Sequence, residues 1–179
     1  MDLETEYQNL CQAQSDISDA LPVLRSYASK VKHVTEFGIR TAVSTTALLA
    51  AQPDTLISYD LELNLPHLEK LLALKGRTDF RFYKGDTRVI EIEPTDFLFI
   101  DTCHQYRQLK AELLRHTNKV RRYIAFHDTT GYRFTDEGDS PTEKKGLWPA
   151  IEEWLAREPW EMCFELPSGW GFTVFQRRS

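Results

Sequence analysis

The sequence predicts an α/β protein built on one doubly wound sheet, and two patterns support this prediction. Short apolar or β-branched runs alternate along the chain with stretches whose apolar residues recur at helical spacing. The last two predicted strands instead follow each other directly through Pro167-Ser168-Gly169, which favours an antiparallel hairpin. We therefore expect a mostly parallel, Rossmann-like sheet of seven strands in which only the strand near 171–176 runs antiparallel.

The individual elements follow from local patterns. Asp96–Asp101 encloses a continuous apolar run, which is typical of a central strand buried on both faces. In the next segment, Tyr106, Leu109 and Leu113 are spaced three and four residues apart and predict one apolar helix face. The other strands are expected at 34–37, 56–60, 80–83, 123–126, 161–166 and 171–176, and the helices at 3–17, 21–30, 44–51, 64–74 (with Asn64 as its cap), 105–115 and 148–156.

Length and composition limit the kinds of protein that this chain can be. A chain of 179 residues is expected to form a single domain, with N-terminal helices in 1–30 and the Rossmann-like core in 31–179. Its content of 41% hydrophobic and 27% charged residues argues against disorder. A net charge of −5 makes a nucleic-acid surface unexpected. The sequence leaves the oligomeric state open.

Three observations lead us to expect a cytoplasmic protein. The longest nearly apolar runs, Ala47–Ala51 and Phe97–Ile100, are too short to span a bilayer, so no membrane partner is expected. The start, Met1-Asp2-Leu3-Glu4, lacks the basic residues and apolar stretch of a signal peptide. The three cysteines are widely spaced and include no CxxC pair, which argues for reduced thiols rather than disulfides or a zinc ribbon.

Ionisable residues gather where the predicted strands end. In an open doubly wound sheet, ligands bind beyond the carboxyl ends of the strands. This edge is therefore a candidate site, and its ionisable residues are Glu36, Asp60, Asp86, Asp101, His127 and Asp128.

The first predicted strand leads into Glu36-Phe37-Gly38-Ile39-Arg40, with Ser44-Thr45 shortly after it. This stretch resembles the Glu-x-Gly-x-Arg-x-x-x-Ser-Thr motif of class I S-adenosylmethionine-dependent methyltransferases, in the small-molecule branch that includes macrocin O-methyltransferase and the cephalosporin-hydroxylase-like proteins. The resemblance covers roughly residues 21–176 and implies S-adenosylmethionine contacts at Glu36, Gly38, Arg40 and Ser44. Arg40 and Ala42 stand where the glycine-rich form has further glycines; a strand-to-helix turn needing one glycine is the alternative.

Two acidic residues match further cofactor positions of this family. Asp60 comes 22 residues after Gly38, where a carboxylate accepts hydrogen bonds from a ribose diol. Asp86 matches the position beside the adenine. A loop carboxylate and a turn residue, respectively, are the alternatives. The resemblance leads us to expect Glu36, Gly38, Asp60 and Asp86 in the wall of one pocket.

The segment Phe99-Ile100-Asp101-Thr102-Cys103-His104-Gln105-Tyr106 resembles the Phe-Ile-Asp-x-x-(Lys/His)-x-Tyr segment of metal-dependent O-methyltransferases, the catechol type among them. In that group an aspartate at the fourth strand and an acidic-amide pair at the fifth bind Mg²⁺, and the matching residues here are Asp101, His127 and Asp128. His127 stands where Asp is usual, and imidazole shifts the preference toward ions such as Mn²⁺. Strand alternation would instead turn His127 to the other face, in a supporting role, unless the strand has already ended and the chain has turned.

These resemblances imply methyl transfer to a hydroxyl of a small-molecule acceptor. A divalent metal, Mg²⁺ or Mn²⁺, on Asp101 and Asp128 would lower the pKa of that hydroxyl, and His104 would take its proton. Without metal the two carboxylates repel each other, so the pKa of one of them is expected to rise. The alternative for His104 is a first-turn residue facing solvent. For the whole protein, a binding module without turnover and a metal-dependent hydrolase or hydroxylase are the alternatives.

Two further features concern the surroundings of this site. Residues 129–147 are polar and predict a long loop, which either closes over the acceptor or is disordered. The four tryptophans are expected to pack in the core or at its rim.

Overall fold

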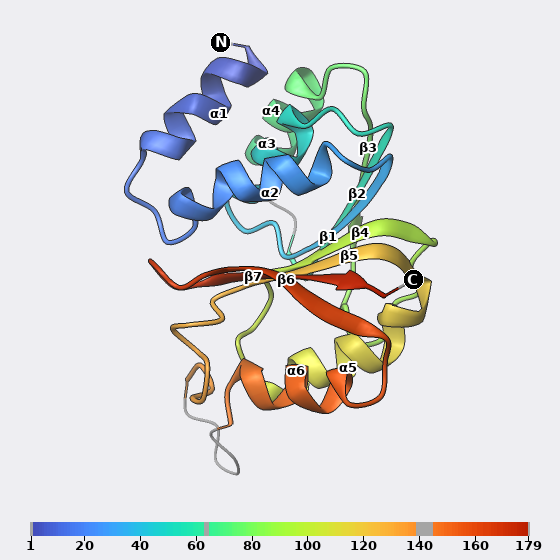
Figure 1. The fold of residues 1–179 in the computed structure, drawn as a ribbon. Coiled ribbons are helices and arrows are strands. Elements are labelled where there is room, and N and C mark those ends of the chain that lie inside the picture. Colours follow the sequence, from blue (N-terminus) through green and yellow to red (C-terminus); the bar gives the residue numbers. More distant parts are fainter. Residues whose placement is uncertain (1, 63–64, 139–144, 179) are drawn as a thin grey trace.

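Figure 1 shows the computed structural model, which describes residues 2–62, 65–138 and 145–178. Its centre is a seven-stranded sheet in the order β3-β2-β1-β4-β5-β7-β6. The strands are β1 (His33–Phe37), β2 (Thr55–Asp60), β3 (Asp79–Lys84), β4 (Thr95–Ile100), β5 (Val120–His127), β6 (Trp160–Leu166) and β7 (Phe172–Arg177).

The direction of the strands confirms the predicted mixed sheet. Neighbouring strands from β3 to β5 are parallel, whereas β7 is antiparallel to both β5 and β6. β7 alone therefore runs against the others. The connection between β6 and β7 spans only residues 167–171, which is too short for the crossover that a parallel pair requires.

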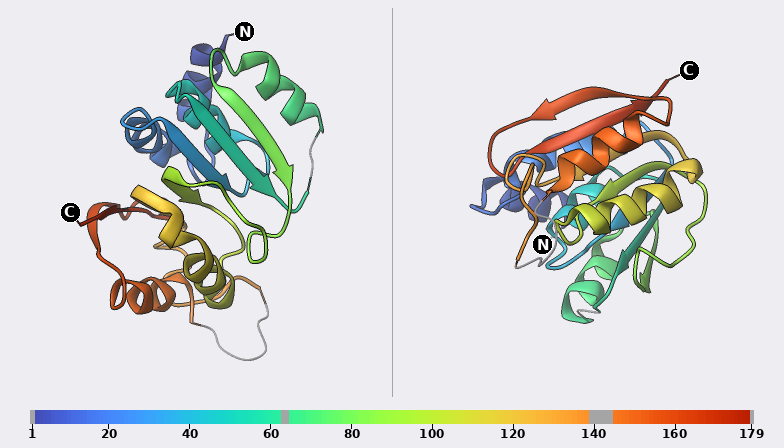
Figure 2. Two further views of the ribbon diagram at one scale, coloured as in Figure 1. Left: turned by 90° about the vertical axis from the view of Figure 1, so that its right-hand side faces the viewer. Right: turned by 90° about the horizontal axis from the view of Figure 1, so that it is seen from below.

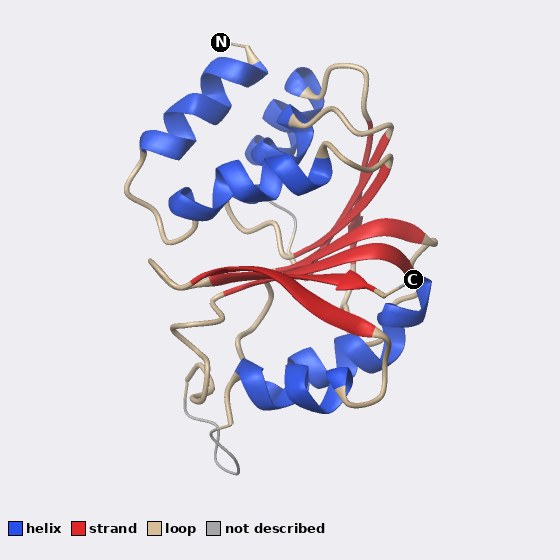
Figure 3. Ribbon diagram, viewed as in Figure 1, coloured by secondary structure: helices blue, strands red, loops and turns tan. Residues whose placement is uncertain are grey.

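Helices cover both faces of the sheet, and each face has its own apolar core (Figures 1 and 3). Tyr7, Leu48 and Leu71 belong to the core under α1–α4, and Leu109 and Ile151 to the core under α5 and α6. Figure 2 shows the two helical layers from the side and from below. The helices are α1 (Leu3–Gln12), η1 (Ser18–Ala20), α2 (Leu21–Ala28), α3 (Val43–Ala50), α4 (Leu65–Leu74), α5 (Tyr106–His116), η2 (Thr117–Lys119) and α6 (Leu147–Leu155).

The central position of β4 explains why residues 97–100 are continuously apolar. Phe97 and Phe99 point into the core under α1–α4, whereas Leu98 and Ile100 point into the core under α5 and α6. Because successive side chains alternate between two buried faces, both sets must be apolar. β4 ends at Ile100, so Asp101 lies at the carboxyl edge of the sheet.

The first helix is shorter than predicted. α1 ends at Gln12 rather than at residue 17, because serine side chains beyond it take up backbone groups. The Ser18 hydroxyl donates to the carbonyl of Leu10 at 3.0 Å, and the Ser15 and Ser18 hydroxyls lie 2.6 Å apart. The resulting loop brings the buried side chain of Ile17 to the carboxyl edge of the sheet.

Other expectations have different outcomes. β5 begins at Val120, three residues before the strand expected at 123–126, so it also contains Arg121 and Arg122. Trp154 and Trp160 are buried in the core, whereas Trp170 is 44% exposed. Asn64, the expected helix cap, lies outside the described residues. In the part of the chain that the structure describes, no helix is long and apolar enough to cross a membrane.

Gly38 lies at the closest approach between the ends of β1 and β4. Its φ of +89° is rarely adopted by L side chains, and a Cβ atom there would overlap the backbone carbonyl of Asp101. The Gly38 N–H donates to the Tyr59 carbonyl at 2.9 Å, and the Asp101 N–H donates to the Phe37 carbonyl at 2.9 Å. The ends of β1, β2 and β4 are thus joined at a point where only glycine fits.

Gly38→Ala is expected to destabilise the protein by more than backbone strain alone, because the added methyl group must push β4 away. Left-handed strain costs about 1–2 kcal/mol, and overpacking adds about 1–3 kcal/mol. Gly138→Ala is the matched control, because Gly138 also has positive φ (+73°) but open space around its Cβ position. Urea unfolding of both variants tests this. Equal losses of unfolding free energy would contradict the close packing at Gly38.

Candidate active site

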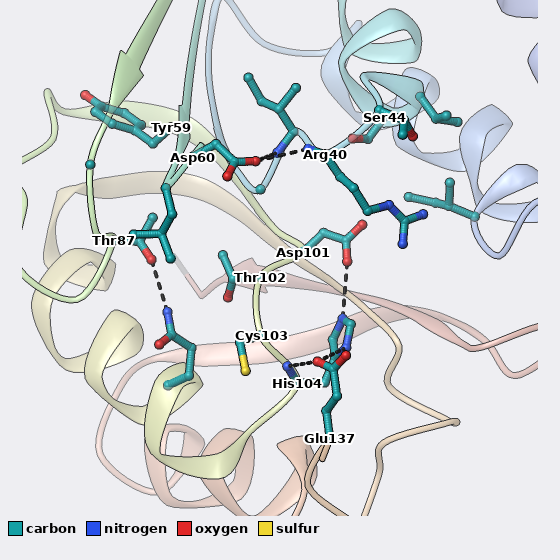
Figure 4. Close-up of a pocket in the computed structure, with 18 residues that line it drawn as sticks. Arg40, Ser44, Tyr59, Asp60, Thr87, Asp101, Thr102, Cys103, His104 and Glu137 are labelled. Atoms are coloured by element: carbon teal, nitrogen blue, oxygen red, sulfur yellow. Dashed lines mark hydrogen bonds and ion pairs between the residues drawn. The ribbon is translucent and has the colours of Figure 1, made fainter. Parts of the chain in front are cut away.

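A cavity of about 300 Å³ lies at the carboxyl edge of the sheet, where the loops after β1, β2, β3 and β4 meet (Figure 4). This volume is at the lower end of the range typical of small-molecule sites. Most of the predicted site residues line it: Gly38, Arg40, Ser44, Asp60, Asp101 and His104. Glu36, Asp86, His127 and Asp128 do not belong to its lining.

The loop after β1 keeps a glycine-like path without the usual glycines. Arg40 (φ 46°) and Ala42 (φ 66°) both adopt the left-handed conformation that favours glycine. These are the two positions at which the sequence departs from the glycine-rich motif. The Arg40 guanidinium forms an ion pair with Asp16 at 2.8 Å, which fastens this loop to the loop after α1. The backbone therefore follows the motif although the side chains differ.

Asp60 holds that loop through its carboxylate. Its Oδ2 accepts hydrogen bonds from the backbone N–H groups of Ile39 at 2.7 Å and Arg40 at 3.0 Å. Its Oδ1 accepts from the Glu62 N–H at 3.1 Å. An ionised carboxylate has about four acceptor positions. About one position is left for a ligand hydroxyl, so Asp60 combines loop support with room for a single further bond.

Glu36 lies behind the cavity and not in its wall as expected. Its side chain is fully buried and accepts hydrogen bonds from the hydroxyls of Ser58, Ser44 and Thr45 at 2.6, 2.7 and 2.9 Å. Burial raises the pKa of Glu36 to about 7, although the three hydrogen bonds act in the opposite direction. Glu36 thereby joins β1, β2 and α3, and Ser44 stands between it and the cavity.

Asp86 does not line the cavity either, although Gly85 and Thr87 on both sides of it do. Its carboxylate pairs with the Arg88 guanidinium at 2.7 Å and accepts the Arg88 backbone N–H at 2.9 Å. Hydrogen bonds from Arg88 lower the pKa of Asp86. The geometry is that of a turn residue, which is the alternative that the sequence left open.

Asp101, His104 and Asp128 form a cluster beside the cavity, after the ends of β4 and β5. One candidate ligand atom from each of the three lies within 4.8 Å of the others. The His104 Nε2 atom is 2.6 Å from Asp128 Oδ2 and 3.5 Å from Asp101 Oδ1. The two carboxylates meet because β4 and β5 are parallel neighbours whose ends lie at the same edge. Figure 4 shows His104 pointing toward Asp101.

His127 joins this cluster, which is the alternative to strand alternation that the sequence left open. Its Nδ1 atom is 3.0 Å from Asp128 Oδ2 and 3.4 Å from Asp101 Oδ1. The reason lies in the backbone, since β5 ends at His127 and Asp128 takes a φ of 60°. This left-handed residue turns the chain, so that two consecutive side chains face the same point. His127 Nδ1 is buried, and no hydrogen bond of good geometry satisfies it among the described residues.

The pKa expectation for the two carboxylates was wrong. Burial acts to raise the pKa of Asp101 and of Asp128, but contacts with His104 and His127 outweigh it, and both pKa values are lowered. The same contacts raise the pKa of His104 to about 9 and that of His127 to about 10, against the effect of burial. Without metal, two imidazolium groups neutralise the carboxylates, so the predicted repulsion does not develop.

The His104 ring also contacts Tyr132 and Glu137, two residues that the sequence did not indicate. Its ring stacks on Tyr132 with centroids 4.6 Å apart and an interplanar angle of 8°. Its Nδ1 atom lies 3.1 Å from Glu137, whose carboxylate also accepts the His104 backbone N–H at 3.2 Å. Tyr132 in turn stacks on Trp170, with centroids 5.6 Å apart. Tyr132 and Glu137 both lie in the loop predicted at 129–147, whose polar sequence has no periodicity that could single them out.

Comparison with known proteins supports the fold. No family model and no curated protein matches this sequence. A protein from Corynebacterium glutamicum superposes with a TM-score of 0.71 and 16% identity, over 99% of this chain and 89% of its own. An O-methyltransferase from Bacillus cereus in complex with S-adenosylhomocysteine gives 0.66 and 15%, over 98% and 90%. The magnesium protoporphyrin IX methyltransferase of Synechocystis with bound S-adenosylmethionine gives 0.67 and 10%, over 91% and 82%.

The fold is therefore that of the class I S-adenosylmethionine-dependent methyltransferases, as the sequence resemblance implied. The chain covers the greater part of each of these structures.

The buried Glu36 predicts a specific pH dependence of stability. Its folded-state pKa of about 7 lies above the ordinary value of 4.5, so the folded protein holds the proton more tightly than the unfolded chain. This contribution to stability is complete below pH 4.5 and is lost as the pH rises to 7. Relative to Glu36→Gln, the wild-type unfolding free energy should fall by up to about 1.4 kcal/mol per pH unit in that window.

Urea unfolding of wild type and Glu36→Gln between pH 4 and 8 measures this difference. Because both proteins share every other titrating group, the difference between them isolates Glu36. A difference that stays constant across the window would show that Glu36 titrates as an ordinary carboxyl.

Proposed function

We propose that this protein transfers the methyl group of S-adenosylmethionine to a hydroxyl oxygen of a small molecule, with a divalent metal at the site. One observation carries the proposal: the cluster of Asp101, His104 and Asp128 borders a cavity at the carboxyl edge of the sheet. In this fold that edge is the ligand-binding edge. The S-adenosylmethionine and S-adenosylhomocysteine complexes of the structural relatives support the choice of cofactor.

The residues of the cluster fit a divalent metal. Carboxylate oxygens suit Mg²⁺ and Mn²⁺, and an imidazole nitrogen shifts the preference toward Mn²⁺. The buried His127 Nδ1 atom without a satisfied hydrogen bond is a further donor beside Asp101 and Asp128. Asp101 and Asp128 would hold the ion together with His127, which leaves His104 Nε2 free.

The cofactor and the metal supply the reactive groups, namely an electrophilic methyl group and a positive charge that lowers the pKa of the acceptor hydroxyl. The chain positions them. Gly38 lines the cavity where the ends of β1 and β4 meet, and Asp60 has an acceptor position free for a ribose hydroxyl. Holding the methyl group in line with the acceptor oxygen supplies much of the rate.

His104 is the proposed base, and Nε2 is the atom that would take the hydroxyl proton. Tyr132 and Glu137 fix the imidazole so that this nitrogen faces the carboxylates. With a cation neutralising Asp101 and Asp128, the cause of the raised His104 pKa is removed, which favours the neutral imidazole that a base requires.

A binding protein without turnover is the second candidate, and the departures at Arg40 and Ala42 from the glycine-rich motif are the observation in its favour. Formation of S-adenosylhomocysteine separates the two. The assay supplies S-adenosylmethionine, Mn²⁺ or Mg²⁺, and a panel of catechols and sugar diols. Turnover on at least one acceptor is expected; tight cofactor binding with no product from any acceptor would favour the binding protein.

Asp60→Ala should weaken the binding of S-adenosylhomocysteine about 10- to 100-fold, because hydrogen bonds to a charged carboxylate contribute about 1.5–3 kcal/mol. Isothermal titration calorimetry measures the loss. Asp86→Ala is the matched control, since the Asp86 carboxylate pairs with Arg88 outside the cavity lining. It should bind within about threefold of wild type. Equal losses in the two variants would remove Asp60 from its proposed role.

Asp128→Asn should weaken Mn²⁺ binding, measured by electron paramagnetic resonance, by at least about tenfold. It should also reduce methyl transfer, as should a chelator with the wild type. Asp96→Asn is the control. Asp96 lies near the start of β4, at the edge of the sheet opposite to the site, and its carboxylate pairs with Arg121. Turnover that survives both the chelator and Asp128→Asn would exclude the metal and leave a base mechanism through His104.

A further inference from the structure

The end of the cavity away from the metal cluster has no assigned ligand group. Gly85 and Thr87, after β3, and Gln108, on α5, line this end. β3 is the neighbour of β2 on the side away from β1 and β4. With the ribose at Asp60 and the methyl group at the cluster, the base of the cofactor extends toward these residues.

On the basis of the proposed function, we propose that Gln108 selects adenine by accepting a hydrogen bond from its 6-amino group. We propose in addition that Glu112 holds the Gln108 amide in the orientation that this bond requires. Gln108 is then a specificity-determining residue of the cofactor site, and Glu112 is a positioning residue.

Glu112 is a fully buried carboxylate that faces three donors. Its Oε1 atom accepts from the Thr87 hydroxyl at 2.5 Å, the Gln108 Nε2 at 2.7 Å and the Thr102 hydroxyl at 2.9 Å. Thr87, Thr102 and Gln108 all line the cavity, and they come from three different segments. The carboxylate therefore fixes polar groups of the cavity wall from behind.

This arrangement determines which way the Gln108 amide points. The Gln108 atom that meets Glu112 Oε1 is the amide nitrogen, which donates to this oxygen at 2.7 Å beside the Thr87 hydroxyl; the nitrogen is thereby turned inward. The same nitrogen also donates to the Thr87 hydroxyl at 3.2 Å (dashed from Thr87 in Figure 4). The amide nitrogen is thus held by this pair of neighbouring oxygens, and no hydrogen bond to the Gln108 carbonyl oxygen is found among the described residues.

An acceptor fixed in the wall of the site discriminates between purine bases. Adenine carries a 6-amino donor, whereas hypoxanthine carries a 6-oxo acceptor that would face the Gln108 carbonyl oxygen unfavourably. Sites built to hydrogen-bond one group reject the analogue that lacks it, because a buried polar atom is left unpaired. His116 supports the same wall, since its Nε2 donates to the Thr87 carbonyl at 2.6 Å.

The test compares the binding of S-adenosylhomocysteine and S-inosylhomocysteine, which differ in the 6-substituent and in the hydrogen that N1 of hypoxanthine carries, by isothermal titration calorimetry. Wild type should bind the adenosyl compound on the order of tenfold more tightly. Gln108→Met keeps the shape of the side chain without its acceptor, so the adenosyl affinity should fall and the ratio should approach one. Glu112→Gln, which allows the Gln108 amide to reverse, should reduce the ratio in the same direction.

Gln105→Met is the matched control, because Gln105 directly precedes the same helix but does not line the cavity; its amide donates to the Glu137 backbone carbonyl. Its ratio should equal that of wild type. Binding of both compounds with a ratio that Gln108→Met leaves unchanged would overturn this proposal alone. Binding of neither compound by the wild type would overturn the proposed function and this inference with it.

Discussion

Two carboxylates at the ends of neighbouring strands are the constraint on which this site depends. Asp101 and Asp128 converge because β4 and β5 are parallel and adjacent, so their ends meet at one edge. Such a pair cannot stay buried and ionised without positive charge beside it. His104 and His127 supply that charge within contact distance. A divalent cation would take over the same role, as in the proposed function.

Contacts from the surrounding loops hold this cluster in place. Glu137 and Tyr132 fix His104 from the loop after β5. That loop is itself fastened to α5 by Asp136, whose Oδ1 accepts the backbone N–H groups of Tyr106 at 2.8 Å and Gly146 at 2.9 Å. His104, the start of α5 and the loop therefore form one hydrogen-bonded unit. A change in any of them should be felt at the imidazole.

How much the sequence could predict depended on whether a local rule applied. The direction of the strands followed from their alternation with helices and from the short turn before β7, because both patterns are local. The alternation rule placed His127 wrongly, since the strand ends there and Asp128 adopts a left-handed conformation. Glu36 was assigned to the cavity because burial by partners such as Ser58, 22 residues away, has no local signal. Glu137 escaped notice for the same reason.

The most direct test of this account is a crystal structure with S-adenosylhomocysteine and Mn²⁺, using anomalous scattering to locate the metal. We expect an anomalous peak bonded to oxygen atoms of Asp101 and Asp128, with the adenine beside Thr87 and its ribose against Asp60. The homocysteine sulfur should lie between that ribose and the metal. A peak elsewhere, or an adenosyl group outside the cavity at the carboxyl edge, would contradict the account.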